Sequence, residues 1–140
     1  MNLEFEAVVG TQRQVRLLYR LLGMRDLHNI SHKQMPEYRE HKKFVEDSGY
    51  RCWFLITFGS QCIGSLYLTY SNVVGIFMIK PKPDWYESSL DWVLKNFEPL
   101  PPLPSERPSS FHINVASRNK ALQQILSAYG AQRIQVTYEI

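Results

Sequence analysis

The sequence predicts an α+β fold, in which a mixed, mostly antiparallel central sheet carries helices on both faces. Three observations support this class. Strand patterns follow one another over 51–79 with only short turns between them. Apolar residues recur at helical spacing on both sides of these strands. Residues 111–140 then have the pattern of strand, helix and strand. A chain of 140 residues can build one substantial core, so we expect a single domain over 1–140.

A capping pattern and a proline mark the first elements. We expect a strand over 4–9 and then a helix that begins at Thr11, because Gln14 three residues later completes a capping box. Pro36 suits the first turn of a second helix, which Gly49 ends. The inward face of this second helix is expected to include Tyr38, His41, Phe44 and Val45.

The middle of the chain predicts an antiparallel meander with strands at about 51–58, 62–70 and 73–79. A two-residue turn at Gly59-Ser60 would place Thr57 opposite Cys62 and Cys52 opposite Tyr67. The two cysteines would then lie too far apart for a disulfide, so we expect both as reduced core residues.

A third helix and a proline-rich segment follow the meander. Asp84 can cap this helix, with Glu87 completing a box-like pair. Its apolar stripe is Tyr86, Leu90, Val93, Leu94 and Phe97. The prolines of 98–110 exclude regular structure there. Their P-x-x-P spacings leave open a role as ligand of a proline-recognising domain, although a stiff surface connection is the simpler interpretation.

Residues 111–140 carry the clearest pattern. Apolar side chains alternate with others over 111–116 and again over 134–140, which predicts two strands. Between them Ser117 can cap a helix, and Gly130 suits its left-handed end. The apolar face of this helix is Ala121, Leu122, Ile125, Leu126 and Tyr129.

Composition argues against several classes of function. The net charge is only +3 and the basic residues are scattered, which disfavours a nucleic-acid or membrane-binding protein. No apolar run approaches the length of a membrane span, and the first residues lack a basic leader, so a cytoplasmic location is the default expectation. Four His and two Cys without zinc spacing predict no metal site.

The order of these elements resembles the GNAT superfamily of acyl-CoA-dependent N-acyltransferases. Asn119 stands where the family motif has Asn, and Gly130-Ala131 stand where it usually has Gly-Phe. The segment 50–79 resembles the family's central strands, and VVGIFMI resembles the strand that leads to the acyl-CoA site. The resemblance implies acetyl-CoA, or another acyl-CoA, as co-substrate. The residues it would place at the cofactor are Phe77, Met78, Ile79, Lys80, Trp85, Tyr86, Ser88, Ser89 and Asn119.

Two departures from the family pattern concern the cofactor and the general acid. The family's diphosphate-binding loop is rich in glycine, whereas 80–89 holds no glycine, two prolines and two acidic residues. Lys80, Lys82 and the serines still offer charge and N–H groups. Many members carry a Tyr seven residues after the motif Asn to protonate the leaving thiolate, and here that position is Leu126.

Candidate catalytic and substrate residues come from three segments. His112 and Asn114 lie two apart in a strand, so they share a face and are our candidate catalytic pair. His28 and His32 fall in the segment between the first two helices, which in this family lines the acceptor site, and each can equally be an exposed polar residue. His41 is expected to be buried. Trp53, Tyr67 and other aromatic residues are expected in the core, although they could stack on a sugar or an adenine.

The resemblance therefore predicts an N-acyltransferase that moves an acetyl or short acyl group from acyl-CoA to an amine of a small molecule or amino-sugar. Attack would be direct, because no nucleophile with a neighbouring base is evident. The alternative is a non-catalytic GNAT-like module that binds a small ligand or a partner protein. A third possibility is a small α+β interaction protein. An unpartnered C-terminal strand would also allow a homodimer.

Overall fold

The computed structural model describes residues 2–25 and 35–140 and has an α+β fold. Its elements, in chain order, are β1 (Leu3–Ala7), α1 (Gln12–Met24), α2 (Tyr38–Glu46), β2 (Cys52–Phe58), β3 (Gln61–Leu68), β4 (Val74–Met78), α3 (Pro83–Asn96) and α4 (Lys120–Tyr129). The strands form one antiparallel sheet in the order β1-β2-β3-β4. The α+β class and the central meander are confirmed.

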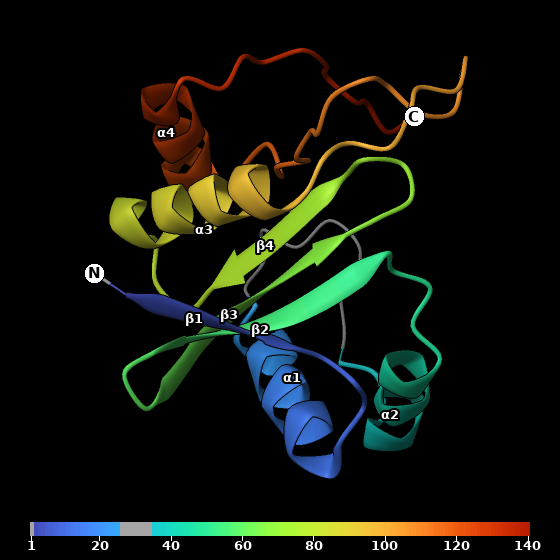
Figure 1. Ribbon diagram of the computed structural model, residues 1–140, viewed down its shortest axis with the longest axis vertical. Coiled ribbons are helices and arrows are strands. Elements are labelled where there is room, and N and C mark those ends of the chain that lie inside the picture. The colour runs from blue at the N-terminus through green and yellow to red at the C-terminus, as the bar shows by residue number, and fades with distance from the viewer. Residues whose placement is uncertain (1, 26–34) are drawn as a thin grey trace.

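Helices cover both faces of the sheet (Figure 1). The helices α3 and α4 lie on one face, over a core that includes Ile56, Leu66, Val93 and Leu126. On the other face, α1 and α2 cover a smaller core that includes Leu21, Val45 and Leu55. The central strands are therefore buried from both sides. None of the helices in the described ranges is both long enough and apolar enough to span a membrane.

The predicted turn at Gly59-Ser60 is present, with Thr57 opposite Cys62. Cys52 lies opposite Leu68, not Tyr67, because a bulge between Ile56 and Thr57 shifts the register by one residue. The two thiols are free, as predicted.

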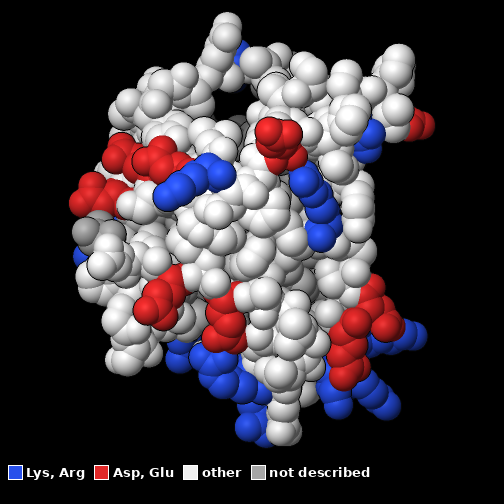
Figure 2. Space-filling view, viewed as in Figure 1, with Lys and Arg blue, Asp and Glu red and all other residues white. Residues whose placement is uncertain are grey.

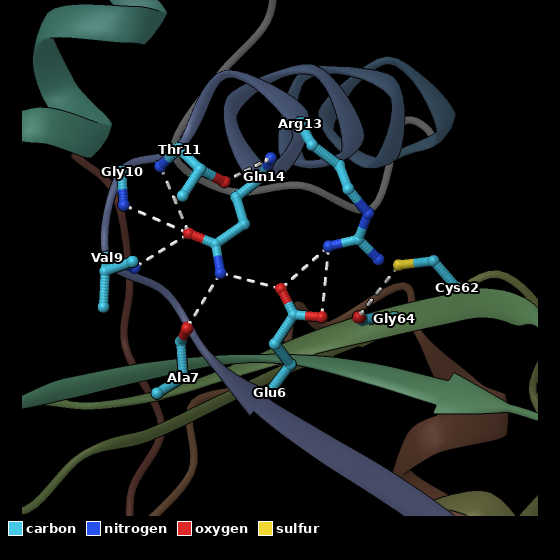
Figure 3. A network of polar contacts seen from close by, with 9 residues as sticks. All are labelled: Glu6, Ala7, Val9, Gly10, Thr11, Arg13, Gln14, Cys62 and Gly64. Atoms are coloured by element: carbon cyan, nitrogen blue, oxygen red, sulfur yellow. Dashed lines mark hydrogen bonds and ion pairs between the residues drawn. The ribbon is translucent and has the colours of Figure 1, made fainter.

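A hydrogen-bond network centred on Gln14 ties β1 to the start of α1 (Figure 3). The Oε1 atom of Gln14 accepts from the backbone N–H groups of Val9, Gly10 and Thr11. The Nε2 atom of Gln14 donates to the carboxylate of Glu6 at 2.7 Å and to the carbonyl oxygen of Ala7 at 2.8 Å. The predicted capping box is confirmed, because Thr11 also accepts from the N–H of Gln14. Buried Gln14 thus pairs with the backbone N–H groups of the turn that leads from β1 into α1.

The starts of the other helices differ from the sequence prediction. The helix α2 begins after its N-cap Glu37, so Pro36 precedes the helix and does not lie in its first turn. The N-cap of α3 is Lys82, with Pro83 as its first residue, and Asp84 makes no cap bond. Asn119, not Ser117, caps α4 by accepting from the N–H of Leu122. Proline's fixed φ suits the first helical position, which favours Pro83 over Asp84 as the point of entry.

Burial also corrects three inward assignments. Phe44 is 52% exposed and Leu94 is 59% exposed, and Tyr38 also reaches solvent, whereas His41 and Val45 are buried as predicted. Each short helix presents only a narrow stripe to the sheet, so flanking apolar positions stay at the surface.

The two strands predicted at 111–116 and 134–140 are not formed in the described structure. His112 makes an isolated parallel bridge with Val73, and this bridge is the only trace of the expected parallel pairing among the described residues. Residues 131–140 are exposed throughout. The alternation is present in both segments, but a strand also requires a paired neighbour along its length.

Candidate functional site

The first part of the candidate site is the free edge of β4. The N–H of Val74 donates to the carbonyl oxygen of His112 at 2.8 Å, and the N–H of His112 donates to the carbonyl oxygen of Asn72 at 3.0 Å. Beyond this bridge, no backbone hydrogen bond within the described ranges joins β4 to 113–115. The two segments are thus held together at one end only.

Ladder geometry exposes backbone groups along this edge. The N–H of Ile79 donates to Ile63 of β3, so in an antiparallel pair the alternate residues Ile76 and Met78 turn their backbone groups away from β3. These are the groups that an extended ligand with amide bonds would pair with.

Asn72 fixes the bridged end of this edge. It is fully buried with a φ of 64°. Its side-chain amide donates to the carbonyl oxygens of Leu100 and Pro108, both at 2.9 Å, and accepts from the N–H of Leu100 at 2.8 Å. The proline-rich segment, which is irregular as predicted, is therefore anchored directly beside the residue that receives His112.

The start of α3 does not fit a diphosphate. Pro83 has no N–H, and the N–H groups of Trp85 and Tyr86 both point at the carbonyl oxygen of Lys82, at 3.1 and 3.4 Å. Asp84 adds a negative charge in this first turn. An anion site at a helix N-terminus needs free N–H donors and a favourable field, and this helix start supplies few of either.

Several predicted cofactor residues serve the core. Trp85, Tyr86, Ser89 and Met78 are buried, and the hydroxyl of Ser89 donates to the carbonyl oxygen of Trp85 at 2.8 Å. Burial raises the pKa of Tyr86, and a polar contact of its hydroxyl with the backbone of Met78 works in the opposite direction. Tyr86 therefore already occupies part of the free edge of β4. Lys80 is exposed, and Phe77, Ile79 and Ser88 are partly exposed.

The predicted catalytic pair lies beside the bridge. Phe111, Ile113 and Val115 pack against the core under α3 and α4, so alternation turns His112 and Asn114 away from that core. Asn114 is exposed, and the Nδ1 atom of His112 is buried without a hydrogen-bond partner among the described residues. Asn119 acts as a helix cap. His28 and His32 lie outside the described residues.

The family's general-acid position is inside the core. Leu126, on the buried face of α4, is only 8% exposed and belongs to the core between the sheet, α3 and α4. Tyr129, one turn later, donates its hydroxyl proton to Asp91 of α3 at 2.6 Å. Burial and this carboxylate raise the pKa of Tyr129 to about 12. Neither residue faces the free edge of β4 as an available acid.

The second part of the candidate site is a cavity of about 180 Å³ between α1, α2 and the sheet. Its walls are mainly apolar and aromatic, and its lining includes Leu18, Leu21, Phe44, Tyr50, Trp53 and Tyr67. The rings of Tyr50 and Tyr67 are stacked, with centroids 4.0 Å apart and planes 3° apart. A cavity of this size admits roughly one ring of a ligand, since sites for whole drug-sized molecules measure about 300–1,000 Å³.

Polar groups converge on this cavity. The Nε1 atom of Trp53 is buried and has no hydrogen-bond partner among the described residues, and the Trp53 side chain forms part of the cavity lining. Buried Ser65 and His41 also line the cavity. Burial lowers the pKa of His41, so its ring is neutral at pH 7. Glu40 and Arg25 add one charge of each sign to the lining.

Tyr67 connects the cavity to β4. A Cβ atom placed on Gly75 would lie 2.1 Å from the Cζ atom of Tyr67, so the tyrosine ring lies directly over this glycine. Gly75 is the register partner of Tyr67 and precedes Ile76 on β4. The aromatic wall therefore reaches across the same strand whose outer edge is free.

Sequence reasoning missed the cavity because its lining comes from four separate elements. The sequence pattern places the aromatic residues of β2 and β3 in the core and gives no sign of a role for Glu40. An available signal was Gly75 within an apolar strand, since an isolated strand glycine marks close approach of another group.

Metal ligands and reactive thiols are not features of the site. Within 2–25 and 35–140, no three His, Cys, Asp or Glu side chains gather as metal ligands. Burial raises the pKa of both cysteine thiols. Figure 2 shows acidic and basic side chains mixed on one face, with Lys and Arg most numerous along the lower edge, where Figure 1 places α1 and α2.

Comparison with known proteins supports the fold alone. No protein-family model matches the chain, and no curated protein matches it. The crystal structure of a domain from Methanocaldococcus jannaschii DSM 2661 is similar, with a TM-score of 0.70 and 12% identity. The match covers 99% of this chain and 93% of that chain. The arrangement of elements is therefore shared with a solved structure over nearly the full length.

Proposed function

We propose that this chain is a GNAT-like N-acyltransferase that moves an acetyl or short acyl group from acyl-CoA to an amine of a small molecule, such as an amino-sugar. The observation that carries the proposal is the edge of β4. The N–H of Val74 donates to the carbonyl oxygen of His112, and β4 makes no further backbone bond to 113–115 among the described residues. An acyl donor with a pantetheine arm, which holds two amides, suits such an edge.

The acceptor amine would bind in the aromatic cavity. The stacked Tyr50 and Tyr67 give a flat aromatic wall, and the lining also includes Ser65, whose hydroxyl is a polar group for the acceptor. The carboxylate of Glu40 favours a cationic amine, and neutral His41 can take up the proton that the amine must lose before attack. A sugar ring with one amine matches a lining that combines a flat aromatic wall, polar groups and the carboxylate of Glu40, with the cation of Arg25 left for a sugar hydroxyl.

The chemistry needs no acyl-enzyme. The amine nitrogen would attack the thioester carbonyl carbon, the C–S bond would break, and the thiolate would leave with the electron pair and take up a proton. Cys52 and Cys62 are poor nucleophiles, because burial raises the pKa of both thiols. His112 and Asn114 remain the candidates for orienting the reacting groups, since they lie on the segment that faces the free edge.

The donor would be held by its pantetheine arm rather than by its diphosphate. The start of α3 supplies few free N–H groups and carries Asp84, so the diphosphate would gain little there. The arm would also have to displace the hydroxyl of Tyr86 from the backbone of Met78. We therefore expect weak binding of acyl-CoA.

A non-catalytic module that binds a small ligand in the aromatic cavity is the second candidate. Two observations favour it. Trp85, Tyr86 and Ser89 are buried, and the first turn of α3 is poorly suited to a diphosphate. In this case the cavity would bind ligand while the edge of β4 would bind no thioester.

Calorimetry with acetyl-CoA and with S-acetyl-pantetheine separates the two candidates. For the acyltransferase we expect both donors to bind with dissociation constants within about threefold, because the diphosphate contributes little. The variant Tyr86→Phe removes only the hydroxyl, so its affinity for both donors should rise. No heat with either donor, in the natural chain and in Tyr86→Phe, would refute the acyltransferase.

Catalysis then needs its own assay. Release of free thiol from acetyl-CoA in the presence of a panel of amino-sugars and small amines should be detected, and Tyr67→Ala should raise the KM for the amine. Donor binding without thiol release for any amine would favour the binding module.

A further inference from the structure

The C-terminal segment 132–140 has the composition of a strand but no partner strand within the described structure. Its apolar residues alternate with Gln135, Thr137 and Glu139. Ile134 is 70% exposed, Val136 53% and Tyr138 83%. Figure 1 shows the segment as an irregular trace leaving the end of α4. Four large apolar side chains in one short segment are costly to leave in water.

The same chain carries a strand-like edge without a partner. At His112 both backbone groups point to the β4 side, since its N–H donates to Asn72 and its carbonyl oxygen accepts from Val74. In an extended segment the backbone groups of the neighbouring Phe111 and Ile113 then point to the opposite side. Within the described residues these groups make no backbone hydrogen bond.

The side chains of 111–115 are also suited to packing beside those of an added strand. Phe111, Ile113 and Val115 pack against the core that lies under α3 and α4. A strand added beside them would place its own alternate side chains on the same face. Ile134, Val136, Tyr138 and Ile140 share one face in that arrangement, so the added strand would continue this core.

We propose that residues 132–140 pair as a β-strand with the 111–115 edge of a second copy of this chain, giving a dimer by reciprocal strand exchange. Each copy provides one unpaired strand sequence and one unpaired edge, which is the self-complementarity that a two-fold dimer needs. Burying four large apolar side chains from each of two tails removes on the order of 1,000 Å² of surface, where specific interfaces begin. Exposure of the whole tail in the isolated chain favours a second copy over pairing within one chain.

Two matched lysine variants test the pairing. Val136→Lys places a charge on the apolar face of the tail, and Gln135→Lys places the same charge on the polar face. Both positions are exposed in the single chain, so neither variant should change its folding. By sedimentation equilibrium, Val136→Lys should weaken dimerisation at least about tenfold, and Gln135→Lys should change it less than about threefold.

Hydrogen exchange identifies the strands that pair. The amides of Ile113 and Tyr138 should exchange slowly in the dimer. The amide of Ile113 should exchange quickly in Val136→Lys and in a chain ending at Ala131, and the amide of Tyr138 should exchange quickly in Val136→Lys. A natural chain that stays monomeric up to about 500 µM would overturn the proposal. A dimer unaffected by Val136→Lys and by the truncation would also overturn it, as would slow exchange at both amides in a monomer, which would mean pairing within one chain.

Discussion

Val74 and His112 form the only described backbone link between β4 and the segment 111–115, through the N–H of Val74 and the carbonyl oxygen of His112 at 2.8 Å. Their neighbours along each segment have no such link in the described structure. A second hydrogen bond lies next to this link, because the carbonyl oxygen of Asn72 accepts from the N–H of His112. The position of the free edge of β4 thus depends on the hydrogen bonds of Asn72, Val74 and His112 at one end, and substitutions there should affect the whole site.

Substitution of Asn72 should lower the free energy of unfolding through two separable effects, the loss of its side-chain hydrogen bonds and strain at its positive φ. Asn72→Ala loses three side-chain hydrogen bonds and places an alanine at a φ of 64°, so we expect a loss of about 3–4 kcal/mol in the free energy of unfolding. Asn72→Gly loses the same bonds without the backbone strain, so it should be less destabilised by about 1 kcal/mol. Urea denaturation measures both. Equal losses would show that the left-handed backbone carries no cost.

Gly75 and Tyr67 should be strongly coupled. Gly75→Ala forces the tyrosine ring aside, and we expect a cost of about 1–3 kcal/mol in the free energy of unfolding together with a smaller cavity. In a Tyr67→Ala background the cost should nearly vanish, whereas in Tyr67→Phe it should persist because the ring remains. A double-mutant cycle measured in urea gives the coupling. A cost of Gly75→Ala that is independent of the residue at 67 would contradict the close approach.

The sequence alone predicted the parts of the fold that rest on local patterns. The capping box at Thr11 and Gln14, the turn at Gly59-Ser60 and the left-handed Gly130 are all present. Each feature depends on residues within a few positions of one another, so a short stretch of sequence contains all the interactions that determine it.

Features that depend on distant partners were not predictable in the same way. The register of Cys52 changes with a bulge between Ile56 and Thr57, beside Gly64, where a Cβ atom would approach the carbonyl oxygen of Phe77 to 2.2 Å. The role of Asn72 depends on Leu100 and Pro108, which are far along the chain. The cavity combines residues from α1, α2, β2 and β3. Tertiary packing decides all three.

Gln14 should be required for the junction of β1 and α1. Gln14→Ala removes the partner of several partly buried donors and acceptors, so the free energy of unfolding should fall by about 2–3 kcal/mol. Gln14→Glu keeps an oxygen for the N–H groups of 9–11 but turns a carboxylate toward Glu6 and the carbonyl oxygen of Ala7. Its loss should therefore be large at neutral pH and smaller near pH 4, where carboxylates take up protons. Urea midpoints of the two variants at both pH values test this contrast.

His41 should make the fold less stable in mild acid. The ring is buried, its Nε2 atom lies 3.3 Å from the carbonyl oxygen of Val15, and burial lowers its pKa below the ordinary value of 6.5. Because the unfolded chain binds a proton at His41 more readily than the folded chain, the free energy of unfolding is fully maintained above about pH 6.5 and falls as the pH drops toward the lowered pKa. Glu40 and Arg25 line the same cavity, and their charges are common to the natural chain and to any His41 variant.

The matched variant for this prediction is His41→Gln, which cannot titrate but keeps a side-chain N–H for Val15. Between about pH 7.5 and pH 5.5 the natural chain should lose more stability than His41→Gln, as followed by urea denaturation at each pH. The remaining histidines are present in both chains, so their contributions cancel in the difference. Parallel pH profiles for the two proteins would mean that position 41 is solvated enough to hold its proton at no cost, and His41 could then not be the neutral proton acceptor that the proposed acyl transfer assigns to it.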